Sequence, residues 1–211
     1  MSSNLKNDKP SISVAAFVEK SPSQLQTEVL TGHEQLGSRR ITSARIQKLG
    51  LALAGFAHYI HEGRLQIVGQ SEVSYLFQLA PEKRIEAINN LDLEKICCLL
   101  LTKNLELPEE FTGIAARVGL PILRTPQVSS NAIGIVSKFL QEALAPQITQ
   151  HGVLLGMHGL GVYLRGESGI GKSECALDLI ARGHRLISDD AVMVKKIGEE
   201  LEGSSPELTY E

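Results

Sequence analysis

A phosphate-binding loop constrains the fold of this chain more than any other feature of its sequence. The loop matches the pattern G-x-x-x-x-G-K-[ST], in which a glycine-rich turn joins a strand to a helix. Its residues are Gly166, Glu167, Ser168, Gly169, Ile170, Gly171, Lys172 and Ser173. The motif therefore predicts an α/β domain with a phosphate site where a strand ends and a helix begins.

The residues on both sides of the loop fit this order of elements. An apolar run at 161–164 predicts the strand, and apolar residues on one face of 174–182 predict the helix. Glycines let backbone N–H groups approach a phosphate chain, and the N-terminus of the helix adds its positive end. The Lys172 ammonium is then placed for the β- and γ-phosphates and the Ser173 hydroxyl for Mg²⁺.

Two adjacent carboxylates follow the next predicted strand. Residues 185–188 form a short apolar segment, and Asp189 and Asp190 come directly after it. One of them could hold magnesium and the other could accept a proton, as phosphoryl transfer requires. An Asp-Asp pair at a strand end is also typical of a turn or a helix cap, so the residue types alone leave both interpretations open.

His151 is a candidate because of its position before two apolar segments. These segments, 153–157 and 161–164, flank a turn centred near Gly159, which predicts a β-hairpin. Continued pairing beyond the hairpin would place His151 opposite Glu167, beside the loop. There the imidazole could tune an acidic neighbour or contact phosphate, and a surface histidine at a strand start is the alternative.

The residues before the loop domain predict a separate α/β domain at 1–147. A continuous apolar run at 95–101 predicts a strand buried on both faces of a mostly parallel sheet, at the centre of that domain. Residues 1–11 are polar and predict a flexible tail. Residues 147–150 predict a polar linker to a second domain at 148–211, the first part of a nucleotide-binding domain.

Charge and composition exclude several classes of partner. The chain has 21 Lys and Arg against 24 Asp and Glu, 4% aromatic residues and no Trp, so it has no basic footprint or stacking platform for nucleic acid. No run approaches the roughly 20 apolar residues that cross a bilayer, so we expect no membrane association. Cys97, Cys98 and Cys175 fit neither a disulfide framework nor a metal-ligand spacing, which suits a reducing cytoplasm.

Two long segments of the chain resemble one bacterial family. The segment HGVLLGMHGLGVYLRGESGIGKSECALDLIARGHRLISDDAV closely resembles HPr kinase/phosphorylase, which acts on a serine of the phosphocarrier protein HPr. The segment LGLALAGFAHYIHEGRLQIVGQSEVSYL is similar to that family's N-terminal domain. The similarity covers nearly everything after the first dozen residues, which a generic nucleotide-binding loop would not do.

This resemblance implies an activity and an assembly. The enzyme would use ATP or pyrophosphate with Mg²⁺ to phosphorylate HPr and would remove the phosphate by phosphorolysis, releasing pyrophosphate. It would thereby regulate carbon metabolism. The resemblance further implies a cytoplasmic homohexamer assembled through the nucleotide-binding domains.

The same resemblance implies roles for particular residues. His151 and Lys172 match catalytic positions, the loop binds the nucleotide phosphates, and Ser173 contacts Mg²⁺. One of the two aspartates is the proton acceptor in phosphorylation and the donor in the reverse reaction. Asp190 is favoured over Asp189.

Family members continue well beyond the position of Glu211. The resemblance therefore implies that this chain holds the N-terminal domain and only the first part of the kinase domain. A non-catalytic nucleotide-sensing interaction module is the alternative, and phosphate turnover distinguishes the two. A general P-loop NTPase is less favoured because Asp189 follows Lys172 closely in the sequence.

Overall fold

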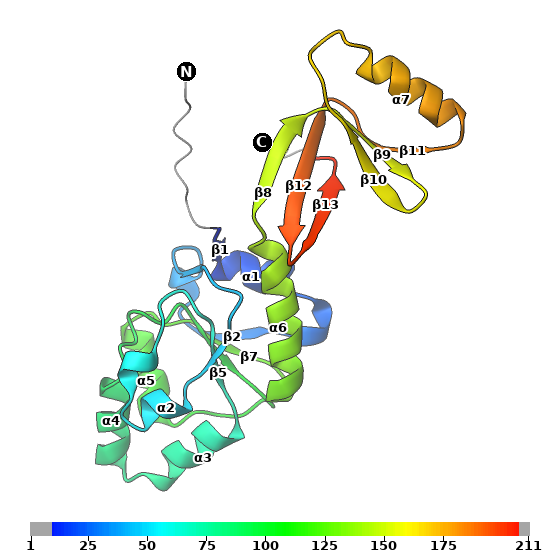
Figure 1. Ribbon diagram of the computed structural model, residues 1–211. Coiled ribbons are helices and arrows are strands. Elements are labelled where there is room, and N and C mark those ends of the chain that lie inside the picture. Colours follow the sequence, from blue (N-terminus) through cyan, green and yellow to red (C-terminus); the bar gives the residue numbers. More distant parts are fainter. Residues whose placement is uncertain (1–9, 207–211) are drawn as a thin grey trace, which may run out of the picture. The chain divides into compact units, whose positions relative to one another are not determined.

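The structure is a computed structural model that describes residues 10–206, so residues 1–9 of the predicted tail lie outside the described range. The chain divides into two compact units, the first ending at Leu144 and the second beginning at Ala145. Each unit contains sheets of its own (Figure 1). Among the described residues, no helix is long and apolar enough to cross a bilayer.

A five-stranded sheet forms the centre of the first unit. Its order is β2-β7-β6-β5-β4, with four parallel strands and β2 antiparallel at one edge. Its strands are β2 (Glu28–Thr31), β4 (Gln47–Lys48), β5 (Gln66–Val68), β6 (Leu99–Leu101) and β7 (Ile122–Arg124). A separate antiparallel pair joins β1 (Ile12–Ser13) to β3 (Arg40–Ile41). The fully buried β6 lies in the middle, which confirms the predicted mostly parallel sheet and its centre. The strand is shorter than the apolar run at 95–101 predicts, because it begins at Leu99.

Helices cover both faces of this sheet because neighbouring strand residues point to opposite sides. Apolar residues of α2 to α5 pack against one face with Val68 and Leu101, and those of α1 and α6 pack against the other with Ile67 and Leu100. The helices are α1 (Val14–Lys20), α2 (Gly50–Leu53), α3 (Gln70–Gln78), α4 (Pro81–Asn89), α5 (Glu109–Arg117) and α6 (Ser129–Ala143). Short 3₁₀ helices are η1 (Ser23–Leu25), η2 (His33–Gln35) and η3 (Ala57–Tyr59).

Two helices of the first unit differ from the sequence pattern. The apolar spacing predicts one helix over 49–60, which is wrong in extent because α2 ends at Leu53 and Gly55 turns the chain with a φ of 102°. The next helix, α3, ends at Gln78, before Pro81. Pro81 then begins α4, which the pattern does not predict, because proline at the first helical position loses no intrahelical hydrogen bond.

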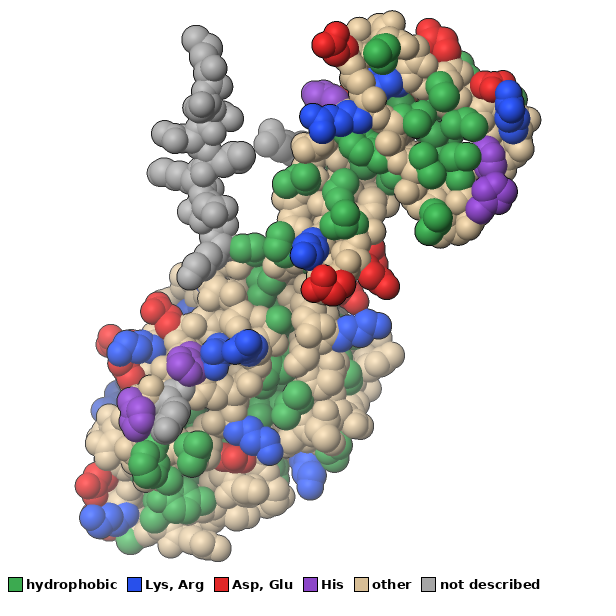
Figure 2. Space-filling view, viewed as in Figure 1, with side chains coloured by type: hydrophobic (Ala, Val, Ile, Leu, Met, Phe, Trp, Pro, Cys, Tyr) green, Lys and Arg blue, Asp and Glu red, His purple; other side chains and the backbone are tan. Residues whose placement is uncertain are grey.

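Acidic and basic side chains are interspersed over the face of the first unit drawn in Figure 2. One half-buried arginine of this unit has a structural function. The Arg39 guanidinium donates hydrogen bonds to the carbonyl oxygens of Leu93, Glu94, Ile96 and Val118. These bonds fasten the segment before β6 and the end of α5 to the segment before β3.

A continuous antiparallel ribbon of two strands forms the frame of the second unit. One ribbon strand runs through β8 and β9 and the other through β11 and β12, with one shift of register near Ile187. The third strand of each sheet flanks the ribbon, β10 beside β9 and β13 beside β12. The strands are β8 (Gln147–His151), β9 (Val153–Met157), β10 (Leu160–Leu164), β11 (Arg185–Ser188), β12 (Ala191–Ile197) and β13 (Glu200–Ser204).

One helix, α7 (Lys172–Ala181), packs on the sheet β10-β9-β11. Ala176 contacts the buried side chains of Val153 and Leu155, with Leu179 and Ile180 at the edge of this small cluster. These residues face the sheet because they recur at helical spacing on one side of α7. The cluster fixes the helix that follows the phosphate-binding loop.

Two predictions for the start of the second unit are wrong. The polar residues 147–150 are not a linker but belong to β8, which is exposed along its whole length and therefore has no apolar alternation in its sequence. His151 does not lie opposite Glu167. It is paired with Ala191 in the ribbon, because β10 ends before reaching it.

Candidate active site

The ribbon bends where its two strands pass from one sheet to the other. His151 ends β8 and Gly152 leads into β9, while Asp189 and Asp190 join β11 to β12. The Gly152 N–H donates a hydrogen bond to the Asp190 carbonyl oxygen at 3.1 Å. This bond brings together residues that lie far apart in the sequence.

The phosphate-binding loop connects β10 to α7, in the order that the motif predicts. Gly169 and Gly171 have φ values of 81° and 95°, which strain any residue that has a Cβ. The helix begins at Lys172, and its first residues line a cavity. Because first-turn N–H groups have no intrahelical acceptor, this helix end can bind an anion.

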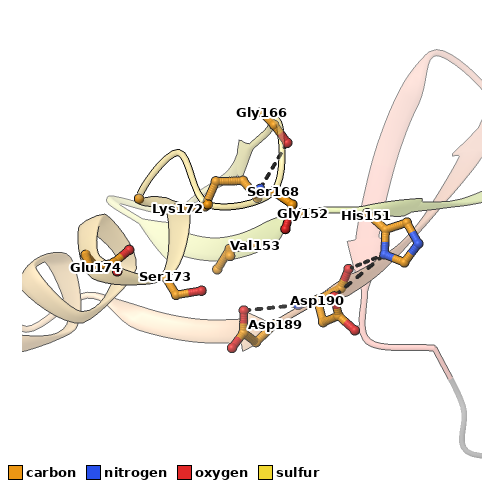
Figure 3. A pocket seen from close by; sticks show the side chains of 12 residues that line it. His151, Gly152, Val153, Gly166, Ser168, Lys172, Ser173, Glu174, Asp189 and Asp190 are labelled. Carbon is orange, nitrogen blue, oxygen red and sulfur yellow. Dashed lines mark hydrogen bonds and ion pairs between the residues drawn. The ribbon is translucent and has the colours of Figure 1, made fainter.

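The Lys172 side chain lies over the loop (Figure 3). Its Nζ donates hydrogen bonds to the carbonyl oxygens of Gly166 at 3.0 Å and Glu167 at 2.7 Å. An ammonium group on a flexible stem is a mobile point charge, and anionic phosphate oxygens attract it more strongly than neutral carbonyls do. Lys172 is therefore placed to exchange these partners for a phosphate.

A cavity of about 650 Å³ lies between the loop and the bend of the ribbon. Small-molecule sites have volumes of roughly 300–1,000 Å³. The cavity lining includes the predicted site residues His151, Gly166, Ser168, Gly169, Gly171, Lys172, Ser173, Asp189 and Asp190. The other two loop residues lie outside the lining: Glu167 supplies a carbonyl to Lys172, and the Ile170 side chain is 69% exposed.

Three residues of the lining were not singled out from the sequence, namely Gly152, Val153 and Glu174. Glu174 follows Ser173 in the first turn of α7, and its place next to the motif is a signal that could have found it. Gly152 and Val153 line the cavity only because the ribbon bends there. No local pattern predicts this bend.

His151 and Asp190 are neighbours at one end of the cavity (Figure 3). The imidazole Nδ1 lies 3.2 Å from the Asp190 carbonyl oxygen and 3.6 Å from its Oδ1. Asp190 has a φ of 72°, a left-handed conformation that aspartate tolerates better than most residues. Its N–H donates to Asp189 Oδ1 at 3.0 Å, so the two carboxylates have different surroundings.

The charges of the lining indicate which metal ion fits. Three carboxylates, of Glu174, Asp189 and Asp190, face one ammonium, so a phosphate chain would enter a site that already carries negative charge. Mg²⁺ takes one or two carboxylates together with phosphate oxygens and water, and the Ser173 hydroxyl with one aspartate offers such a set. Within residues 10–206 there is no cluster of three or more His, Cys, Asp or Glu that could hold a metal alone. The residues therefore fit Mg²⁺ that binds together with a nucleotide.

Two family models match nearly the whole chain. Residues 12–140 match the HPr Serine kinase N terminus, and residues 142–211 match the HPr Serine kinase C-terminal domain. The HPr kinase/phosphorylase of Brevibacillus brevis is 44% identical over 181 residues, and that of Geobacter sulfurreducens is 44% identical over 186 residues. These matches cover 85% and 88% of this chain, and the chain spans 58% of the length of each relative.

A solved structure, that of the Hpr(Ser) kinase/phosphatase from Coxiella burnetii, is 43% identical over its matched part. This match covers 29% of the present chain and 37% of that chain, with a TM-score of 0.27. The family assignment rests on the sequence matches, which extend over both units. They confirm the resemblance found in the sequence, and the chain belongs to the HPr kinase/phosphorylase family.

Proposed function

We propose that the second unit transfers a phosphoryl group from ATP or pyrophosphate to a seryl residue of HPr, and removes it by phosphorolysis, so regulating carbon metabolism. The main support is that one cavity is lined by the phosphate-binding loop, His151 and both aspartates. Phosphoryl transfer demands mainly positioning and charge stabilisation from a protein. In the lining, the phosphate-binding loop offers groups that position a phosphate, and Lys172 offers a positive charge.

The donor would bind with its phosphates against the loop. N–H groups of the loop and of the first turn of α7 would hold the phosphate oxygens, and Lys172 would leave the carbonyl oxygens of Gly166 and Glu167 to join them. Ser173 and Asp189 would hold Mg²⁺. When bound, the ion supplies positive charge that offsets the charge on the transferring phosphate.

Asp190 would accept the proton of the attacking serine hydroxyl, a contribution typically worth about 10²–10⁴ in rate. The serine oxygen forms a bond to phosphorus as the bond to the leaving phosphate breaks. In phosphorolysis, an oxygen of inorganic phosphate forms a bond to the phosphorus of the phosphoserine as the bond to the serine oxygen breaks. The product is pyrophosphate, and Asp190 would return the proton to the serine oxygen. His151, with its Nδ1 at 3.6 Å from the Asp190 carboxylate, would orient this carboxylate.

The test is the intact mass of HPr after incubation with the 211-residue chain, ATP and Mg²⁺. We expect a gain of one phosphate on serine, and we expect Lys172→Ala to abolish it. Lys196→Ala, which removes an exposed lysine of β12 in the same unit, should retain the activity. Nucleotide binding without any transfer would instead favour the nucleotide-sensing module for this chain.

The proposal extends to assembly and location. From the family resemblance we propose a homohexamer that acts in the cytoplasm, where HPr would be its protein partner. Sedimentation equilibrium of the purified chain tests the assembly. A monomer at all concentrations would contradict it for these residues.

A further inference from the structure

Tyr163 lies in β10, beside the bend of the ribbon, and does not line the cavity. Its hydroxyl donates a hydrogen bond to the carbonyl oxygen of His151 at 2.7 Å. Tyr163 is paired with Leu154 in the sheet, two residues from Gly152, and its side chain reaches the last residue of β8. The bond therefore ties the edge strand β10 to the residue at which the ribbon leaves the sheet.

Gly152 makes this arrangement possible. A Cβ on Gly152 would overlap the Tyr163 ring and would lie 2.6 Å from the carbonyl oxygen of Leu164. Because glycine has no Cβ, the ring can lie directly against the backbone of the bend. The Tyr163 ring thus packs against Gly152, and its hydroxyl forms a hydrogen bond with His151.

The same short backbone segment holds Asp190. The Gly152 N–H donates to the Asp190 carbonyl oxygen at 3.1 Å, and the His151 Nδ1 lies 3.2 Å from that oxygen. A contact that fixes the peptide between His151 and Gly152 therefore fixes both the imidazole and the backbone that carries the Asp190 carboxylate. The His151 side chain is 88% exposed and the Asp190 side chain is 90% exposed, so little other packing holds them.

We infer that Tyr163 is a positioning residue, whose hydroxyl sets the placement of His151 and Asp190 relative to the phosphate-binding loop. This inference rests on the proposed function, because it gives those two residues their roles in phosphoryl transfer. Tyr163 itself touches neither the cavity nor the loop lysine. Its effect is on the rate of transfer and not on donor binding.

The test compares Tyr163→Phe with Tyr75→Phe, which removes a phenol hydroxyl from α3 of the first unit. The Phe variant at Tyr163 keeps the ring and loses one hydrogen bond, so kcat for HPr phosphorylation should fall about tenfold. The KM for ATP should stay within about twofold, because the loop is unchanged. Amide hydrogen exchange at Gly152, followed by NMR, should become about five- to tenfold faster. Tyr75→Phe should change none of these quantities.

Two results would overturn the inference. One is an unchanged kcat together with unchanged exchange at Gly152. The other is a fall in kcat accompanied by equal losses in ATP affinity and melting temperature, which would show a general structural role for Tyr163. If the unmodified chain transfers no phosphate, the proposed function fails for this chain, and exchange at Gly152 alone then decides whether Tyr163 holds the bend.

Discussion

Replacing Gly152 by alanine should destabilise the second unit, because the bend has no room for a side chain. The added Cβ would lie 2.6 Å from the Leu164 carbonyl oxygen and would overlap the ring of Tyr163. Overpacking a filled site costs about 1–3 kcal/mol. Displacing the Tyr163 hydroxyl from the His151 carbonyl costs about 0.5–1.5 kcal/mol more. We therefore expect the free energy of unfolding of this unit to fall by about 1.5–4.5 kcal/mol.

Hydrogen exchange read by mass spectrometry is the appropriate assay, because peptides of the two units are separated by mass. The free energy of opening of peptides from β9 and β10 should fall by the amount expected for the free energy of unfolding of this unit. The free energy of opening of peptides from the first unit should be unchanged. Gly161→Ala in β10 is the matched control, since its Cβ would lie 3.7 Å from Leu154 Cδ1, an ordinary contact. Equal exchange in the Gly152 and Gly161 variants would refute the packing argument.

Two further predictions concern the first unit. The backbone N–H of Glu110 and the Arg84 guanidinium, whose Nη1 lies 2.9 Å from both carboxylate oxygens, hold the pKa of the Glu110 carboxyl below its ordinary value of 4.5. The stabilising contribution of this ion pair is present above pH 4.5 and is lost as the pH falls through the lowered pKa. In urea titrations, the free energy of unfolding of Glu110→Gln should therefore fall less at acid pH than that of the unchanged chain. An equal fall in both would count against this pairing. Gly134 in α6 has nothing within 4 Å of an added Cβ. Because alanine favours a helix over glycine, Gly134→Ala should raise the free energy of unfolding by about 0.5–1 kcal/mol in the same titrations. A lower free energy of unfolding would contradict this prediction.

The phosphate-binding loop could be predicted because its fixed residues act locally. Gly171 must adopt a positive φ, Lys172 must carry the charge and begin the helix, and Ser173 must supply a hydroxyl. These requirements appear as a short pattern in the sequence. The central strand β6 was equally visible, because burial on both faces requires an unbroken apolar run. In both cases a single short segment of the sequence contains the residues that specify the structure.

Features that depend on pairing between distant segments could not be predicted in this way. Strand β8 is exposed along its length, so its polar sequence resembles a linker, and only its pairing with β12 makes it a strand. The placement of His151 depended on this pairing, so the extrapolated hairpin gave it the wrong partner. The four backbone acceptors of Arg39 come from two other segments of the chain, and no spacing in the sequence indicates them.

The continuity of the ribbon has a mechanical consequence. His151 and Asp190 lie on its two strands at the bend and are joined to each other there, so they move together. The loop is carried instead by β10 and α7. A change in the angle of the bend would therefore alter the distance from the Asp190 carboxylate to the loop without breaking the contact with His151. Since transfer rates depend steeply on such distances, a change in the angle of the bend would change the rate of the transfer that we propose.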